Sequence, residues 1–124
     1  MTDEILIRKV ADIGFMASSA GLPKHAFAIF NAIEKARPDS TLPYLGFALE
    51  FMNKKMNQEA LEILEKQALP KAPDDPSIKA FIGMVLMLEG RNKESEDYLT
   101  AALNTDEPEV KVMAGELLNN IHKG

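Results

Sequence analysis

The sequence predicts an all-α fold of seven helices, arranged as three helix-turn-helix repeats followed by a C-terminal capping helix. Three observations lead to this prediction. Apolar residues recur at helical spacing along the chain, glycine or proline interrupts the pattern at intervals, and equivalent residues recur every 34 or 35 positions. A period of this length is typical of an α-solenoid, in which each helical hairpin covers the apolar face of its neighbour.

The composition is that of an ordinary folded protein. Of the 124 residues, 46% are hydrophobic and 27% are charged, so we expect a single domain with its own core. The formal net charge of −5 argues against a nucleic-acid surface, which requires clustered Lys and Arg. The absence of cysteine suits a reducing compartment, and Arg8 and Lys9 cut the apolar run Ile5–Ile7. We therefore expect a cytoplasmic protein with neither a signal peptide nor a membrane span.

The first helical pair is expected between residues 3 and 36. Its first helix carries apolar or small residues at helical spacing, namely Ile5, Ile7, Val10, Ile13, Gly14 and Ala17. Gly21-Leu22-Pro23 then breaks the pattern. The second helix, His25–Ala36, ends before Pro38 and has one apolar face made of Ala26, Ile29, Phe30 and Ile33.

The second pair begins with the stretch Leu42–Met52, in which Glu50 is the only charged residue. Ser40 or Thr41 can cap this helix, and Pro43 is tolerated in its first turn. A helix that is apolar all round must be covered on every side, so the stretch raises the question of whether a second molecule supplies part of the cover. The helix Gln58–Ala68 completes the pair.

The third pair and a last helix follow. Asp75-Pro76 is a strong helix start, because Asp can accept hydrogen bonds from free N–H groups and proline needs none at that position. From Ala80 the run is again apolar all round, Gly90 turns the chain, and 98–103 forms the next apolar face. The last helix starts after Asp106-Glu107-Pro108, and its apolar stripe consists of Val110, Met113, Leu117, Leu118 and Ile121.

Five sets of residues show the period. Small residues stand where paired helices would touch, at Gly14, Ala48 and Gly83. The turn positions are Gly21, Lys55 and Gly90. The second helices share Ala26, Ala60 and Ser95 and, four residues later, Phe30, Leu64 and Leu99. A proline follows each second helix, at Pro38, Pro73 and Pro108.

This pattern resembles the tetratricopeptide repeat (TPR) over residues 7 to 109. The resemblance implies one TPR domain, 1–124, with repeats at about 7–40, 41–75 and 76–109 and a capping helix at about 108–122. The chain departs from the TPR pattern in four ways. The usual tryptophan is absent, Lys55 replaces a turn glycine, Ser95 replaces an alanine, and the connection Gln67–Asp74 carries one extra residue.

Few groups in the chain suit catalysis. His25 and His122 are the only histidines, and His25 lies where a solvated helix-start residue is expected. No His-Glu-x-x-His pair and no glycine-rich phosphate loop occurs. The acidic pairs Asp74-Asp75 and Asp106-Glu107 fit helix capping. We therefore expect no enzymatic activity, no catalytic or metal-binding residues and no cofactor.

The TPR resemblance also indicates a binding surface, because the first helix of each pair lines the concave groove of a TPR array. Leu42, Leu45, Leu49 and Met52 are spaced 3, 4 and 3 apart and share one helical face. The fold itself is expected to use a different face of that helix, made of Tyr44, Phe47, Ala48 and Phe51. The candidate partner-binding residues are Phe15, Leu42, Leu45, Leu49, Met52, Met84, Met87 and Leu88. An amphipathic helix is the expected ligand.

Within the TPR proteins, the chain is similar to the small co-chaperones of the type III secretion needle subunit. The similarity lies in the size of the chain, its acidic charge and the residue pattern of 11–14, Gly21, 26–38 and 43–52. It implies a groove that sequesters an amphipathic helix of a needle-type subunit and prevents premature polymerisation, with a second small helical chaperone alongside. Two alternatives stay open: a generic TPR protein-protein interaction scaffold, and a groove covered by a second copy in a homodimer or by the chain's own C-terminal helix.

Overall fold

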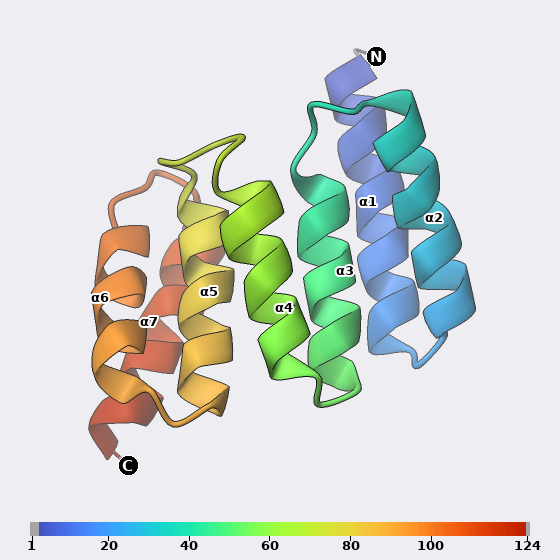
Figure 1. The fold of residues 1–124 in the computed structure, drawn as a ribbon. Helices are drawn as coiled ribbons and strands as arrows, with labels where there is room; N and C mark the ends of the chain where they lie inside the picture. The colour runs from blue at the N-terminus through green and yellow to red at the C-terminus, as the bar shows by residue number, and fades with distance from the viewer. Residues whose placement is uncertain (1–2, 124) are drawn as a thin grey trace. The chain divides into compact units, whose positions relative to one another are not determined.

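A computed structural model of the chain describes residues 3–123, and all regular structure within this range is helical. The chain forms two compact units that meet in sequence between Ile63 and Leu64. Unit 1 contains α1 (Asp3–Ser19), α2 (Pro23–Ala36), α3 (Leu42–Asn53) and α4 (Asn57–Ile63). Unit 2 contains the π-helix η1 (Leu64–Ala68), α5 (Pro76–Leu88), α6 (Asn92–Ala102) and α7 (Pro108–Lys123) (Figure 1). The expected all-α class with seven α-helices is confirmed for the described residues.

Consecutive helices pack against each other inside each unit (Figure 1). In unit 1, α2 contacts both α1 and α3, α1 also contacts α3, and α3 contacts α4. In unit 2, α6 contacts both α5 and α7, and α5 contacts α7 and η1. This pattern is compatible with stacked helical hairpins, and the TPR assignment stays a prediction.

Local sequence signals start several helices as expected. The Asp75 side chain accepts a hydrogen bond of 2.8 Å from the backbone N–H of Ser77, so Asp75 caps α5. At the start of α3, the Ser40 hydroxyl oxygen accepts a hydrogen bond of 3.2 Å from the N–H of Leu42, while Thr41 makes no side-chain cap. Pro43 and Pro76 both lie in a first turn, where their missing N–H is not needed.

The three equivalent turns share one backbone conformation. Gly21, Lys55 and Gly90 have φ angles of 75°, 61° and 77°, all in the left-handed region. Glycine adopts this region without steric cost, whereas a residue with a Cβ atom does not. Lys55 therefore adopts the same turn conformation as the two glycines, at a cost in backbone strain.

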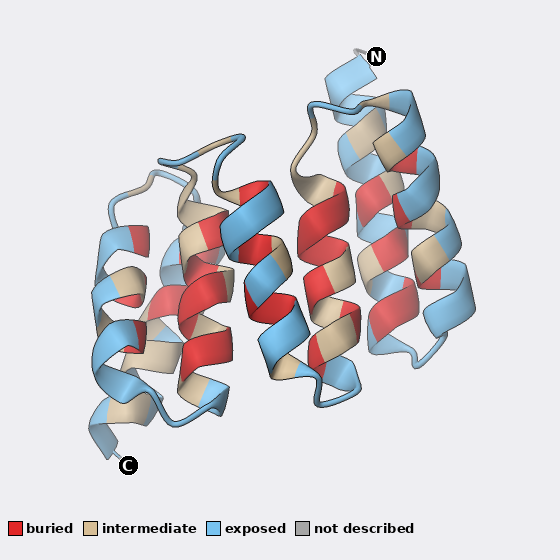
Figure 2. Ribbon diagram, in the orientation of Figure 1, coloured by how far each residue is buried: buried red, intermediate tan, exposed pale blue. Residues whose placement is uncertain are grey.

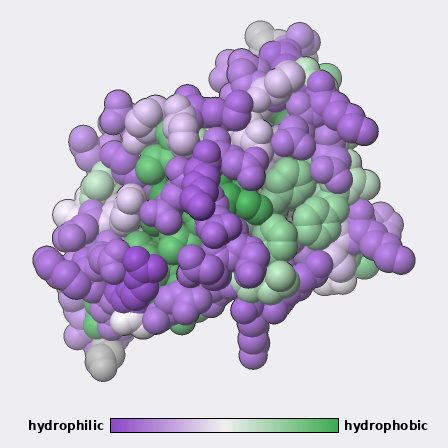
Figure 3. Space-filling view, viewed as in Figure 1, coloured by the Kyte–Doolittle hydropathy of each residue, from purple (hydrophilic) through white to green (hydrophobic). Residues whose placement is uncertain are grey.

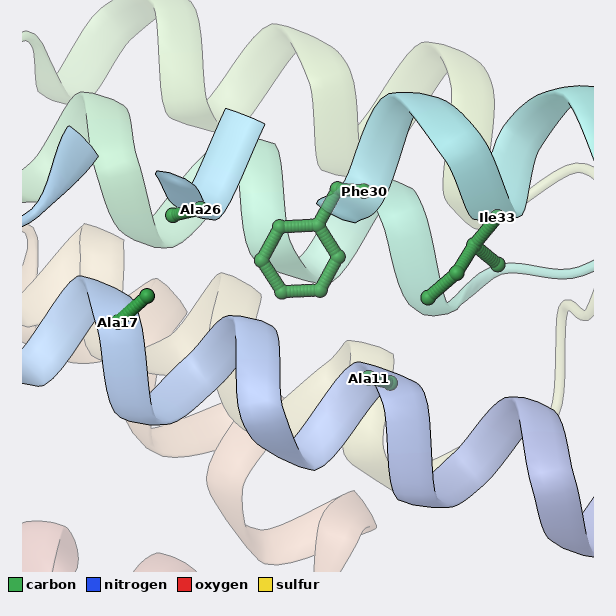
Figure 4. Packing of buried hydrophobic residues seen from close by; sticks show 5 residues of the cluster. All are labelled: Ala11, Ala17, Ala26, Phe30 and Ile33. Carbon is green, nitrogen blue, oxygen red and sulfur yellow. The ribbon is translucent and has the colours of Figure 1, made fainter. Parts of the chain in front are cut away.

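The core of unit 1 is built around Phe30, which points from α2 toward α1 (Figure 4). Its ring is fully buried and lies with Ala11, Ala17, Ala26 and Ile33 in one cluster. Two glycines make room for it. A Cβ atom at Gly14 of α1 would lie 2.8 Å from the ring, and one at Gly46 of α3 would overlap it. The close approach of α1, α2 and α3 thus depends on glycine at both positions.

The core of unit 2 repeats this construction around Leu99 of α6. A Cβ atom at Gly83 of α5 would lie 2.6 Å from the Leu99 side chain. Ser95 is also fully buried, and its hydroxyl donates a hydrogen bond of 2.6 Å to the carbonyl oxygen of Gly83. The serine that replaces the usual alanine is thus satisfied by the neighbouring helix.

The capping stripe of α7 packs as expected. Val110 and Ala114 belong to the buried cluster of unit 2, which also contains Ala80, Leu99 and Ala102. The other stripe residues pack against this cluster while half-buried, namely Met113, Leu117, Leu118 and Ile121. The C-terminal helix therefore covers the α5–α6 hairpin.

The connection Gln67–Asp74, for which the sequence predicts one extra residue, begins inside a helix. The helix that begins as α4 continues into η1, where the N–H of Leu69 donates to the carbonyl oxygen of Leu64 at 2.8 Å. This five-residue step defines a π-turn, which accommodates one inserted residue without breaking the helix. Leu64 and Ala68 remain fully buried at the two ends of η1.

Candidate functional site

The eight candidate residues are divided between the two units. Unit 1 carries Phe15 on α1 and the set we call the α3 face, which consists of Leu42, Leu45, Leu49 and Met52. Unit 2 carries the set we call the α5 face, which consists of Met84, Met87 and Leu88. Both faces lie on helices that are rich in buried residues along most of their length (Figure 2).

Burial separates the four residues of the α3 face into two pairs. Leu45 and Met52 keep only 5% and 9% of their surface exposed. Leu42 and Leu49 are half-buried. Side chains as buried as Leu45 and Met52 have little surface left for a partner, so the contact surface of the α3 face is carried by Leu42 and Leu49.

Phe15 and Leu42 also stabilise the fold of unit 1. Both pack against the Phe30 cluster while half-buried, and the ring centroids of Phe15 and Phe30 are 5.0 Å apart. Aromatic pairs at this separation attract each other beyond the effect of buried area. These two residues therefore hold the core and keep an exposed edge at the same time. On unit 1, Leu49 is the half-buried candidate that the Phe30 cluster does not include.

The other side of α3 faces α2, as the sequence predicts. Phe27 of α2 lies 5.8 Å from Phe47 and 6.4 Å from Phe51 between ring centroids, and Phe30 lies 6.2 Å from Phe47. Tyr44 is buried, and burial, followed by the carboxylate of Glu34 that accepts its hydrogen bond, raises the pKa of its phenol. The rings of Phe27, Phe47 and Phe51 are half-buried, and the surface over α2 and α3 shows an apolar patch among hydrophilic side chains (Figure 3).

On the α5 face, exposure rises toward the C-terminal end of the helix. Met84 and Met87 are half-buried, and Leu88 is 54% exposed. Elsewhere on α5, Ile78, Ile82 and Leu86 are almost completely buried and offer no surface to a partner. The α5 face thus offers two flexible thioether side chains and one exposed leucine, a combination that adapts to apolar partners of different shape.

A buried polar contact, which the sequence analysis did not identify, ties α1 to α3. Glu50 is only 2% exposed, and its carboxylate accepts a hydrogen bond of 2.6 Å from the buried Ser18 hydroxyl. Next to it, the amide nitrogen of Asn53 donates to the Ser18 carbonyl oxygen at 3.4 Å. A buried carboxylate needs such partners, because desolvation penalises its charge. The sequence signal that could have predicted this contact was Glu50 itself, because it is the only charged residue in an apolar stretch.

Both histidines are exposed. His25 is exposed at the start of α2, and His122 is exposed on α7, 3.8 Å from a Glu96 carboxylate oxygen. Within residues 3–123, no three His, Cys, Asp or Glu side chains gather as a metal site would require. The chemistry available on the two faces is therefore that of apolar contact.

No protein-family model matches the chain, and no curated protein sequence matches it. No helix within residues 3–123 has the length and apolar content needed to cross a bilayer.

Proposed function

We propose that the chain is a protein-binding TPR module whose α3 face and α5 face are each a docking surface for the apolar side of an amphipathic helix. One observation carries this proposal. The expected first helices of the second and third repeats each present Leu and Met side chains that are half-buried or exposed, Leu49 on α3 and Met84, Met87 and Leu88 on α5. The surface that these side chains leave exposed is available to a partner.

The TPR part of the proposal is supported by the burial of equivalent positions. Each second helix has two fully buried residues four positions apart, and the three pairs are Ala26 and Phe30, Ala60 and Leu64, and Ser95 and Leu99. The small residues of the first helices are buried as well, at Gly14, Ala48 and Gly83. The same residue positions thus perform the same packing role in each expected repeat.

The accessible candidates can supply a useful binding energy. Leu42, Leu49, Met84 and Met87 are half-buried in the free chain, so a partner would cover the remainder of each side chain. Covering the remaining third or less of such a side chain contributes up to roughly 1 kcal/mol, and the more exposed Leu88 contributes somewhat more. After the entropic cost of association, these contacts suit a complex of moderate affinity.

The more specific part of the proposal is that the partner is a needle-type subunit of type III secretion and that the chain acts as its cytoplasmic chaperone. This part of the proposal is supported by the resemblance in chain length, charge and residue pattern described above. Sequestration is the mechanism: a covered apolar face on the subunit cannot make the contacts that build a filament. A second small helical chaperone completes the complex in this proposal.

A synthetic peptide tests the general part of the proposal. The probe is a fluorescent helix of about 20 residues with Leu on one face and Lys elsewhere, because a net charge of −5 favours a basic partner. A scrambled peptide of equal composition controls for charge alone. We expect fluorescence anisotropy to show binding of the amphipathic peptide only. Leu88→Asp and Leu49→Asp should each weaken it about tenfold, and Val112→Asp on α7 should not.

Co-expression tests the specific part. The chain should keep a needle-type subunit encoded beside it soluble as a defined complex, and Leu49→Asp should abolish that complex while the far-UV circular dichroism is unchanged. If the subunit polymerises as much in the presence of the wild-type chain as in its absence, the chaperone role is rejected and a generic interaction scaffold is the remaining function. Equal binding of both peptides in the first experiment would instead reject the two faces as the binding site.

A further inference from the structure

The side of α1 that faces away from the core of unit 1 is apolar and exposed. Ile5 and Leu6 are about half exposed, at 49% and 50%, and Ile13 and Met16 are 56% and 69% exposed. The sequence spacing groups Ile5 and Ile13 with core residues, but the buried residues of α1 are Ala11, Gly14, Ala17 and Ser18. The exposed residues therefore form a second apolar surface, which we call the α1 outer face.

The α1 outer face consists of two neighbouring rows. The first row contains Leu6 and Ile13, seven residues apart. The second row contains Ile5, Lys9, Asp12 and Met16, at steps of 4, 3 and 4 residues. Lys9 and Asp12 are both exposed, so the second row has opposite charges at its centre and an apolar residue at each end.

This order is self-complementary. If a second copy lies antiparallel across α1, a two-fold axis midway between residues 9 and 12 places Lys9 against Asp12 of the second copy, and Asp12 against its Lys9. The same axis places Ile5 against Met16 of the second copy, because both pairs are centred on the same point of the chain. An isologous interface has this reciprocal form. A parallel arrangement would place Lys9 against Lys9.

We propose that the α1 outer face is a homodimer interface that pairs α1 antiparallel with α1 of a second copy. In the first row, the same axis brings Leu6 close to Ile13 of the second copy. Complementary charge at the centre of the second row fixes both the direction and the register. The proposal concerns α1 alone and does not depend on helix binding by the α3 and α5 faces.

The exposed area sets the strength of this dimer. The four apolar side chains expose on the order of 400 Å² per copy, which is as large as the greatest apolar patch of a typical monomer. Two copies together would bury roughly 800–900 Å² from these side chains, somewhat less than a standard stable interface. A reversible dimer in the micromolar range is therefore expected.

Sedimentation equilibrium of the full chain between about 1 μM and 1 mM tests the proposal. The wild-type chain should change from monomer to dimer across this range. Ile13→Glu should remove the dimer while the circular dichroism is unchanged, because Ile13 is exposed. Val112→Glu, at a residue of similar exposure on α7, should leave the dimer intact.

Charge reversal tests the register. Lys9→Glu places two acidic residues against each other in its own dimer, and Asp12→Lys places two basic residues against each other. Each variant alone should dimerise about tenfold more weakly than wild type. An equimolar mixture restores opposite charges at both contacts, so it should form a heterodimer more readily than either variant forms a homodimer.

Three results would overturn the proposal. If the chain stays monomeric up to about 1 mM, the α1 outer face is not a homodimer interface and its partner is a different protein. A dimer that survives Ile13→Glu uses another surface. A mixture of the two charge variants that associates no better than either variant alone contradicts the antiparallel register.

Discussion

Substitution of Gly46 by alanine should destabilise unit 1, although alanine normally favours a helix. A Cβ atom at this position would overlap the Phe30 ring. The ring has no free direction in which to move, because it is fully buried, Gly14 approaches it from α1, and the rings of Phe15 and Phe47 lie 5.0 Å and 6.2 Å away. The added methyl group must therefore displace α2 or α3.

The expected magnitude combines two opposing effects. Replacing glycine by alanine inside a helix stabilises it by about 1 kcal/mol. Overpacking a closed core costs about 1–3 kcal/mol, and the upper end applies here because three ring carbons are overlapped. The net expectation is a loss of about 2 kcal/mol in the free energy of unfolding.

Urea unfolding followed by circular dichroism measures this change, and hydrogen exchange localises it to α1–α3. Gly115→Ala in α7 is the matched control, since a Cβ atom there would meet nothing within 4 Å beyond its own helix and chain neighbours. That control should gain up to about 1 kcal/mol. If Gly46→Ala is as stable as wild type, or more stable, the close packing of Phe30 against α3 is wrong.

Two further predictions concern stability. Lys55→Gly should stabilise the chain by up to about 1 kcal/mol, because the relief of left-handed strain at φ 61° outweighs the added conformational freedom of the unfolded chain. Thermal unfolding measures this change, and a lower unfolding midpoint than that of the wild type would contradict it. Glu50→Ala should cost about 2 kcal/mol, because it leaves the buried Ser18 hydroxyl without its acceptor. In a double-mutant cycle with Ser18→Ala, strictly additive losses would show that the contact contributes nothing.

The packing of the hairpins could be predicted because it repeats. A residue type that recurs every 34 or 35 positions identifies a shared role, and Ala26, Phe30, Ser95 and Leu99 are all fully buried. The position of the extra residue was less certain, since counting only places it between Leu64 and Pro73. The structure shows a π-turn at Leu64–Ala68, which accommodates one additional residue and overlaps only the start of the predicted connection Gln67–Asp74.

Exposure was harder to predict than helix position. The spacing of Leu45 and Met52 places them with Leu42 and Leu49, yet the first two are buried and the others are not. Similarly, Ile5 and Ile13 share the helical spacing of core residues and are exposed. The helical period fixes which residues share a face, but neighbouring helices decide how much of that face is covered, and a single sequence does not specify their distance.

Methyl NMR of the methionines tests binding by the α5 face most directly. The chain has seven methionines, of which Met84 and Met87 lie on the α5 face, Met16 lies on the α1 outer face and Met56 lies in the turn before α4. On titration with the amphipathic peptide, the methyl signals of Met84 and Met87 should shift, and those of Met16 and Met56 should stay in place. Unchanged signals from Met84 and Met87 at saturating peptide would contradict the proposed function.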